Sequence, residues 1–361
     1  MFLVKHSLSG FRNIKSLEFE PSPLVNVVCG ENGQGKTNLL ESVFLLTGGK
    51  SFRGAKDASL IERGSDFSVI SSDFFSEDRL QSIKIKISDK GRVASLNKGT
   101  EKKASSLVGK FCSVVFSPEH LSLVKGSPNM RRKFLDTALC QISGSYLSSL
   151  RAYTRLLDQK NSLLKDSRFI SAANEMLDVY DAQFAVAACD ITAKRRAFVE
   201  ELLPLAEKNY EKISNGKERL SFKYLSTLFG EGEADTDEAL LKTYALRAAD
   251  LRAGFCTAGP HRDDLLICLD EEDSKVFASQ GQQRCIVLSL KLAEAELMEL
   301  KLGERPVLLL DDVLSELDAN RQDFLLESIT DTQAIITCCA PELILEKTDA
   351  RVFTVDNGQL L

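Results

Sequence analysis

At residues 30–37 the chain reads Gly30-Glu31-Asn32-Gly33-Gln34-Gly35-Lys36-Thr37, which fills every fixed position of the phosphate-binding loop pattern G-x-x-x-x-G-K-[ST]. The three glycines permit backbone dihedrals that turn successive N–H groups toward an oxyanion. In this pattern Lys36 reaches the β- and γ-phosphates of a bound nucleotide, and the Thr37 hydroxyl lies on Mg²⁺. The stretch therefore predicts a site for a nucleoside triphosphate and Mg²⁺.

The sequence on both sides of the loop supports this prediction. Upstream, residues 24–29 form an apolar run that is typical of a short buried strand. Downstream, residues 38–46 have the pattern of a helix, whose N-terminus adds N–H groups and a favourable dipole to the phosphate site. Strand, loop and helix follow one another in the order that a phosphate-binding loop requires.

The composition is that of a soluble globular protein. With 361 residues, the chain is long enough for two or three domains, or for one large head with an insertion. Nine cysteines without a C-x-x-C pair favour neither a zinc ribbon nor a disulfide framework, and they indicate a reducing compartment. Because neither a signal peptide nor a membrane-spanning stretch is evident, we expect a cytoplasmic protein without a membrane partner.

The net charge of −6 is unevenly distributed along the chain. Residues 125–223 contain 17 basic and 12 acidic residues, whereas the remainder is strongly acidic. This segment indicates either a local surface for a polyanion or solvated helix faces. Two basic clusters within it are candidates for contact with DNA phosphates, although such clusters are as often ion-paired or solvated. They comprise Arg131, Arg132, Lys133, Lys194, Arg195 and Arg196.

The spacing of apolar residues divides the chain into three parts. Alternation of period two before residue 100 predicts mostly antiparallel strands. Residues 129–203 lack proline, and their leucines recur at helical intervals, which predicts an inserted helical domain. Strand-like alternation returns after residue 254. We therefore predict an α/β head made of residues 1–125 and 251–361, interrupted by a helical arm at residues 126–250.

An apolar run at residues 307–310 ends in two acids, Asp311 and Asp312. At the mouth of a parallel sheet, the first carboxylate can hold Mg²⁺ through water. The second can orient or deprotonate the attacking water. Beside a complete phosphate-binding loop, this pattern predicts the acidic half of the nucleotide site.

A third motif, Ser279-Gln280-Gly281-Gln282, opens a predicted helix that ends near Gly303, the position of a C-terminal cap. Serine and glycine at a helix N-terminus can bind an anion by the same means as the first loop. Taken alone, Ser279 would be a simple N-cap. However, the helix precedes the strand that ends in Asp311, and Ser315-Glu316-Leu317-Asp318 follows that strand.

Together these motifs resemble those of an ABC-type ATPase head, and their separation by a helical insertion resembles the SMC-like branch of such heads. Further motifs resemble the RecF family of bacterial recombination mediators over nearly the whole chain. They are Gly10-Phe11-Arg12-Asn13, Ser51-Phe52-Arg53, Phe116-Ser117-Pro118-Glu119, Arg131-Arg132-Lys133-Phe134-Leu135-Asp136, Gly259-Pro260-His261-Arg262-Asp263-Asp264-Leu265 and Ser279-Gln280-Gly281-Gln282-Gln283-Arg284.

The resemblance implies a head that dimerises around ATP. Residues 30–37, with Arg12 and Asn13, would bind the nucleotide, and Thr37 and Asp311 would hold Mg²⁺. Lys36 and Asp312 would be the catalytic residues. The third motif, called the signature in such heads, consists of Ser279, Gln280, Gly281 and Gln282. The signature of one subunit would cap the γ-phosphate bound by the other subunit, and Asp318 would lie at the dimer seam.

The chain departs from most ABC heads after the predicted strand at residues 333–337. The expected histidine is replaced by Cys338 and Cys339, so Thr337 is the remaining candidate to donate a hydrogen bond to the γ-phosphate. Asp312 stands where transporters have a catalytic glutamate, and the shorter side chain reduces the reach of the base. We therefore expect weak ATPase activity, with hydrolysis used as a conformational timer.

As a whole, the resemblance implies an ATP-dependent DNA-binding protein of replication, SOS-linked repair and recombination. It would bind single-stranded, duplex and gapped or junction DNA, act with RecR and RecO, and help to load RecA. An ABC transporter subunit is the main alternative, which the helical insertion and the missing histidine disfavour. A chromosome-organising protein would need longer arms, and a P-loop kinase would leave the Ser279 motif unexplained.

Overall fold

The computed structural model describes residues 1–167 and 172–361, which form two compact units. The first unit comprises residues 1–121, 209–216 and 280–361, and the second comprises residues 122–208 and 217–279. The phosphate-binding loop and both aspartates of the acidic motif lie in the first unit. No helix in the described part of the chain is both long and apolar enough to cross a membrane.

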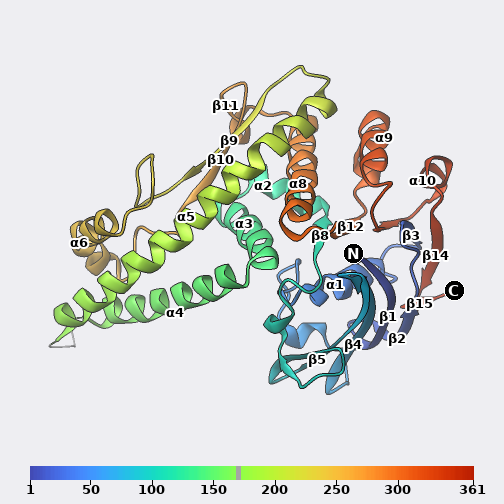
Figure 1. The fold of residues 1–361 in the computed structure, drawn as a ribbon, viewed down its shortest axis with the longest axis horizontal. Coiled ribbons are helices and arrows are strands. Elements are labelled where there is room, and N and C mark those ends of the chain that lie inside the picture. The colour runs from blue at the N-terminus through green and yellow to red at the C-terminus, as the bar shows by residue number, and fades with distance from the viewer. Residues whose placement is uncertain (168–171) are drawn as a thin grey trace. The chain divides into compact units, whose positions relative to one another are not determined.

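A six-stranded antiparallel sheet forms one layer of the first unit. Its strands follow the order β2-β1-β4-β5-β6-β7, and Figure 1 shows β1, β4 and β5 side by side. Burial alternates along β4 and β5, as the period-two sequence pattern predicts. The strands are β1 (Phe2–Phe11), β2 (Ile14–Phe19), β4 (Phe67–Ser76), β5 (Arg79–Ser88), β6 (Gly91–Leu96) and β7 (Lys102–Lys103).

A second, mixed sheet positions the nucleotide motifs. Its order is β15-β14-β3-β13-β12-β8, in which all neighbours are parallel except β14 and β15. Strands buried on both faces carry continuous apolar runs, and β12 and β13 are of this kind. The strands are β3 (Val25–Cys29), β8 (Ser113–Phe116), β12 (Val307–Asp311), β13 (Ala334–Cys338), β14 (Arg351–Asp356) and β15 (Gln359–Leu360).

Two helices of the first unit were predicted from the sequence, and α1 begins and ends two residues earlier than the predicted range of 38–46. The helix after the signature stops at Gly303, whose positive φ of 74° suits a left-handed cap. The helices are α1 (Lys36–Phe44), α8 (Gln280–Leu302), α9 (Ala319–Ser328) and α10 (Glu342–Lys347). Short 3₁₀ turns occupy Leu45–Thr47, Asp57–Leu60, Ala104–Leu107, Pro118–Leu121 and Leu314–Glu316.

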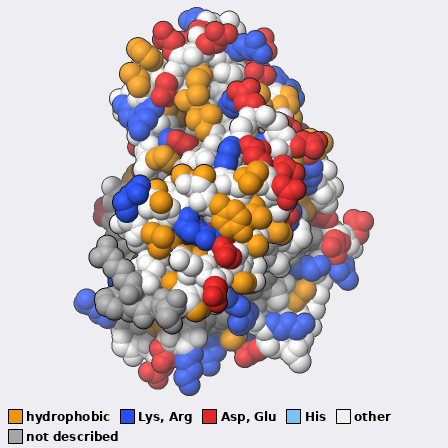
Figure 2. All heavy atoms as spheres, turned by 90° about the vertical axis from the view of Figure 1, so that its left-hand side faces the viewer, with side chains coloured by type: hydrophobic (Ala, Val, Ile, Leu, Met, Phe, Trp, Pro, Cys, Tyr) orange, Lys and Arg blue, Asp and Glu red, His pale blue; other side chains and the backbone are white. Residues whose placement is uncertain are grey.

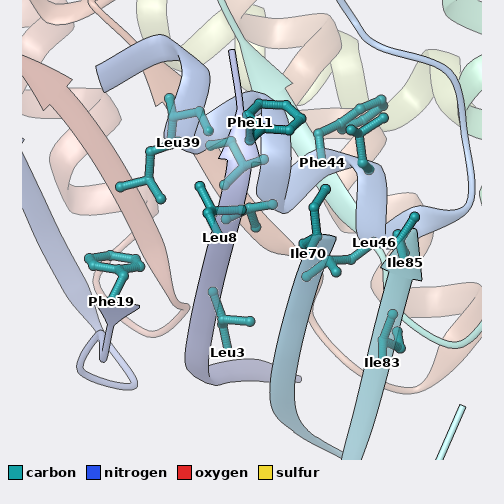
Figure 3. Packing of buried hydrophobic residues seen from close by; sticks show 14 of the residues in the cluster. Leu3, Leu8, Phe11, Phe19, Leu39, Phe44, Leu46, Ile70, Ile83 and Ile85 are labelled. Carbon is teal, nitrogen blue, oxygen red and sulfur yellow. The ribbon is translucent and has the colours of Figure 1, made fainter. Parts of the chain in front are cut away.

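The core of the first unit lies against the antiparallel sheet. Figure 3 shows side chains of β1, β4 and β5 directed toward those of α1 and the turn after it. Removing this apolar surface from water is the main force that holds α1, and with it the phosphate-binding loop, in place. The labelled members are Leu3, Leu8, Phe11, Phe19, Leu39, Phe44, Leu46, Ile70, Ile83 and Ile85.

The second unit is largely helical and includes a small antiparallel sheet of order β11-β10-β9. Its helices are α2 (Ser122–Lys125), α3 (Pro128–Ile142), α4 (Gly144–Asp166), α5 (Ala173–Ser214), α6 (Thr236–Ala253) and α7 (Ser274–Phe277). The last turn of α5 belongs to the first unit. The strands are β9 (Leu220–Leu225), β10 (Asp264–Leu269) and β11 (Glu272–Asp273).

The strand at residues 264–269 corrects one sequence-based expectation. We expected it in the C-terminal part of the head, but β10 pairs with β9 and so belongs to the second unit. Alternation of apolar residues shows that a strand forms without showing which strand it will pair with. The predicted fold class is otherwise confirmed: an α/β head with a mixed sheet, an antiparallel subdomain and a helical insertion.

Candidate nucleotide site

The phosphate-binding loop connects β3 to α1 at the carboxyl edge of the mixed sheet. Gly30, Gly33 and Gly35 have positive φ angles of 151°, 85° and 114°, values that L side chains rarely adopt. A Cβ atom on Gly30 would collide with the carbonyl oxygen of Val355, so that no larger residue fits there without backbone movement. The glycines therefore allow the loop to turn tightly beside β14.

Lys36 is the first residue of α1, and its side chain turns back into the loop. Its ammonium group donates hydrogen bonds to the carbonyl oxygens of Gly30 and, at 3.0 Å, of Glu31. Phosphate oxygens are charged acceptors and form stronger hydrogen bonds than carbonyl oxygens do. The position of this ammonium group therefore suits the predicted phosphate contact.

Asp311, the last residue of β12, accepts hydrogen bonds from two hydroxyl groups. Thr37 donates at 2.8 Å and Thr337 at 3.0 Å, both to Oδ1. Burial raises the pKa of the Asp311 carboxyl, while the two hydroxyl donors oppose this rise. Protein sites for Mg²⁺ commonly supply one or two oxygen ligands beside those of the nucleotide. Thr37 and Asp311 fit such a site.

Asp312 follows directly and has a positive φ of 53°, which is uncommon for a residue with a side chain. Its backbone is held from two sides, because its N–H donates to Thr337 Oγ1 at 3.1 Å and its carbonyl accepts from Ser315 Oγ at 2.8 Å. Such unusual backbone conformations gather at functional sites. The role of Asp312 as a base stays a prediction.

Thr337 has a different position from the one expected of a γ-phosphate sensor. It is buried, and its hydroxyl contacts Asp311 and the N–H of Asp312. The reason is the sheet register, which pairs Thr337 with Asp311 on adjacent parallel strands. The side chain beside the loop is that of Cys339, whose Sγ lies 3.7 Å from Lys36 Nζ and 3.4 Å from Asn32 Oδ1.

Arg12 and Asn13 form the turn between β1 and β2. Arg12 donates two hydrogen bonds, at 2.7 and 2.8 Å, to the carboxylate of Glu41, which is fully buried in α1. Arg12 therefore anchors the helix that follows the loop. Asn13 contacts the loop itself, since its amide group donates to the carbonyl of Gly33 at 3.4 Å and its oxygen accepts from Asn38 at 2.8 Å.

The closing hairpin also contacts the loop. Gln34 accepts hydrogen bonds from two backbone N–H groups, from Asn357 on its side-chain oxygen at 2.7 Å and from Gly358 on its carbonyl at 3.0 Å. The Asn–Gly pair predicts a hairpin but not its contact with a loop more than three hundred positions away. Sequence reasoning likewise missed Glu41, because no motif marks it.

The signature residues surround the first turn of α8. Ser279 and Gln280 are exposed, and Gly281 and Gln282 are half-buried. A Cβ atom on Gly281 would lie 3.2 Å from the guanidinium group of Arg321. Arg321 forms an ion pair of 2.6 Å with Asp318, which also caps α9. Arg321 therefore joins the signature to the predicted seam residue, a link that the sequence does not reveal.

Two of the six candidate DNA contacts are buried. Arg131 is 5% exposed and forms a bidentate ion pair with Asp264, and Arg195 is 2% exposed and pairs in the same way with Asp136. Burial acts against the charge of Arg195, yet Asp136 and neighbouring hydroxyl groups hold its pKa above the usual value. These two arginines hold the second unit together and cannot contact DNA in this conformation.

The other four candidates differ in accessibility. Arg132 donates to the carbonyl of Asp263 at 2.6 Å, and Lys194 pairs with Asp190 at 2.8 Å. Arg196 binds backbone carbonyl oxygens of the loop after β9. Lys133 is exposed. Successive helical residues point about 100° apart, so a basic triplet cannot present three side chains on one face.

On the face that Figure 2 shows, Lys and Arg side chains are interspersed with acidic and hydrophobic ones.

Comparison with known proteins identifies related sequences along the whole chain. The family model for the RecF/RecN/SMC N terminal domain matches residues 2–359. A protein of Clostridium botulinum named DNA replication and repair protein RecF is 39% identical over 365 residues, covering 100% of this chain and 99% of its own. A protein of the same name from Agathobacter rectalis is 40% identical with the same coverage.

Solved structures agree with this result. The structure described as the recombination mediator protein RecF with ATP in the RecFOR pathway superimposes with a TM-score of 0.92. It is 32% identical, and the alignment covers 100% of this chain and 97% of that one. An Smc head domain of Pyrococcus furiosus aligns with a TM-score of 0.56 at 15% identity, which shows a shared fold.

Proposed function

The chain belongs to the RecF family, and on this premise we propose that it is an ATP-dependent DNA-binding protein of replication and recombinational repair. The observation that carries the proposal is the hydrogen bond from Thr37 to Asp311, which connects the phosphate-binding loop to the acidic strand across 274 positions of the chain. Two motifs far apart in the sequence thereby form one site with the donor and acceptor groups that ATP requires.

Each residue of the site has a defined task in this proposal. The loop N–H groups and the N-terminus of α1 hold the phosphates, and Lys36 exchanges its loop carbonyls for phosphate oxygens. Thr37 and Asp311 hold Mg²⁺, which would neutralise charge on the phosphates. Asp312 orients or deprotonates the attacking water. Because this aspartate is one methylene shorter than glutamate, hydrolysis is slow and acts as a timer.

The signature completes the site of a second subunit. The exposure of Ser279 and Gln280 supports this arrangement, because both are accessible to a partner. Asp318 and Arg321 would lie at the seam, where their ion pair supports Gly281. Each dimer would then contain two composite sites, each with a loop from one subunit and a signature from the other.

DNA binding and partner binding are further parts of the proposal. Among the six candidates, the exposure of Lys133 makes it the most accessible phosphate contact. We propose that the ATP-bound dimer binds gapped or junction DNA and acts with RecR and RecO to help load RecA on single strands. The exact boundaries of the head and the arm remain a proposal, in which the second boundary moves from residue 251 to a point after β10.

The test is the binding of a fluorescein-labelled gapped duplex, followed by fluorescence anisotropy with ATP and Mg²⁺ or with ADP. Wild type is expected to bind at least about tenfold more tightly with ATP, a difference of about 1.4 kcal/mol. Lys36→Ala should lose this difference, whereas Lys15→Ala, which removes an exposed lysine of β2, should retain it. Equal DNA affinity of wild type with ATP and ADP would refute the proposal.

Mixing two variants tests the composite site. Lys36→Ala lacks the phosphate contact, and Ser279→Arg lacks the signature, so neither variant alone can assemble a complete site. A mixed dimer contains one intact site, made from the loop of the Ser279→Arg chain and the signature of the Lys36→Ala chain. The mixture should therefore recover part of the ATP-dependent DNA binding. No recovery at any mixing ratio would contradict action across the dimer.

A further inference from the structure

A large groove lies within the second unit, remote in sequence from every nucleotide motif. It has a volume of about 910 Å³ and is lined by α5, by β9 and by the loop at residues 226–234. Its size falls in the range of sites that hold a ligand rather than a few water molecules. The residues on its three sides indicate which class of ligand the groove could bind.

The first wall is an unpaired strand edge. In the sheet order β11-β10-β9, β9 has a partner on one side only. The N–H of Asp270 donates to the carbonyl of Arg219, which marks that pair as hydrogen-bonded. Because such pairs alternate in an antiparallel ladder, the backbone groups of Leu220, Phe222 and Tyr224 point away from β10.

These outward backbone groups have no partner among the described residues. Neither the loop contacts nor the side-chain hydrogen bonds involve the N–H or carbonyl of Phe222 or Tyr224. An edge strand is often guarded by a lysine, and Lys223 holds that position, but it is ion-paired with Glu231. A row of unpaired donors and acceptors beside a groove is the arrangement to which an extended peptide can add as a further strand.

The second wall leaves room for side chains. On α5, the exposed residues that line the groove are small, Ala193 and Ala197, followed one turn later by Glu200. On the opposite side, Phe222 and Tyr224 also line the groove, and both residues are buried. A strand placed beside β9 would direct alternate side chains toward the two alanines.

The rim of the groove carries a small net negative charge. Glu200, Glu231 and Glu233 line it and are exposed. Glu231 is ion-paired with Lys223, and Arg196 keeps its positive charge while it binds the carbonyl oxygens of Gly230 and Gly232, so that Glu200 and Glu233 outweigh a single arginine. An acidic rim repels a nucleic-acid backbone and attracts a cationic segment. The charge of the lining therefore favours a cationic peptide over a nucleic-acid strand.

We propose that the groove between α5 and β9 binds an extended, basic peptide segment of a partner protein by adding it as a fourth strand to the sheet. Apolar side chains of the segment would pack over Ala193 and Ala197, and its lysines or arginines would lie near the glutamates of the rim. This surface goes beyond the proposed ATP-dependent function, since none of its residues belongs to the nucleotide site.

The test uses a fluorescein-labelled octapeptide of alternating Val and Lys, titrated with the full chain at low salt. We expect a Kd on the order of 100 μM, and at least tenfold weaker binding of the matching Val and Glu peptide. Hydrogen exchange should slow at the amides of Phe222 and Tyr224 when the peptide is bound. No binding at about 1 mM peptide, or unchanged exchange at those amides, would overturn the proposal.

Two matched variants make the test specific to the groove. Ala197→Arg fills the groove and adds a positive charge, while Ala182→Arg makes the same change at another exposed position of α5. The first should weaken peptide binding at least tenfold, and the second should not change it. Equal effects of the two, or displacement of the peptide by an oligothymidine strand, would contradict a peptide groove. Lys36→Ala should bind the peptide as wild type does, which separates this proposal from that of nucleotide binding.

Discussion

Asp312 is the residue whose chemistry the ATPase account depends on most. We expect Asp312→Asn to lower the rate of ATP hydrolysis about a hundredfold, because the amide cannot accept a proton from the attacking water. ATP affinity should change less than about twofold, since the loop, Lys36 and Thr37 remain. Steady-state phosphate release and calorimetric titration measure the two quantities.

The matched control for this change is Asp331→Asn, which removes a carboxylate that is 83% exposed on the same unit. It should leave hydrolysis unchanged. If Asp312→Asn hydrolysed ATP at the wild-type rate, Asp312 would not be the catalytic base.

Mutation of a buried and of an exposed basic residue in the second unit should change the free energy of unfolding by different amounts. Arg195→Met removes the ion-pair partner of Asp136, a carboxylate that is 23% exposed and keeps its hydrogen bond from Tyr146, and should lower the free energy of unfolding by about 2 kcal/mol. Lys133→Ala removes an exposed charge and should change it by less than about 0.5 kcal/mol. Urea denaturation measures both values.

For DNA affinity, the exposed Lys133 should matter more than the buried Arg195. If Lys133 contacts a phosphate, its loss should reduce the slope of log affinity against log salt by about 1. A salt slope identical to that of wild type would remove Lys133 from the DNA contacts.

Single residues of the site were predictable where the chemistry is local in sequence. The spacing of residues 30–37 requires glycines, a lysine and a hydroxyl at fixed positions. The structure gives the glycines positive φ angles and sets the Thr37 hydroxyl on Asp311. The pair formed by Arg12 and Glu41, and the contact of Gln34 with the closing hairpin, depend on tertiary packing. The contacts of Thr337 could not be predicted for the same reason, because strand register decides what this residue contacts.

At the scale of elements, His6 connects β1 with α1 and β4. Its Nε2 lies 2.7 Å from Ser42 Oγ and its Nδ1 lies 2.8 Å from Ser72 Oγ, and the ring is fully buried. The Ser42 hydroxyl donates to the carbonyl of Leu39 at 2.6 Å, so Nε2–H donates to Ser42 and Nδ1 accepts from Ser72. Burial lowers the pKa of His6 to about 3.

This shift predicts a loss of stability in acid. Above pH 6.5 the ring is neutral in both states; below it, the unfolded chain gains a proton that the folded chain refuses until about pH 3. Unfolding should therefore become easier as the pH falls, by about 2 kcal/mol between pH 7 and pH 5 from His6 alone. His6→Gln should remove this contribution in urea titrations at the two pH values. An unchanged pH dependence in the variant would contradict the burial of a neutral ring.

The positions of helices and strands could be predicted better than the pairing of the strands. The strands of the antiparallel sheet follow from alternation, and the C-terminal end of α8 follows from its glycine cap. The pairing of β10 with β9 could not be predicted from the sequence, because alternation of apolar residues does not show which strand lies alongside. The unpaired edge of β9 could not be predicted either, because it depends on which strands pair.

At the scale of the whole molecule, the central claim is that two chains close around ATP. In the proposed dimer, one chain would supply the loop and the acidic strand, and its partner would supply the signature. The most direct measurement is sedimentation velocity with ATP and Mg²⁺ or with ADP, on wild type and on Ser279→Arg. We predict that ATP doubles the mass of wild type, that ADP does not, and that Ser279→Arg stays monomeric in both. A wild-type chain that remained monomeric with ATP would contradict the account.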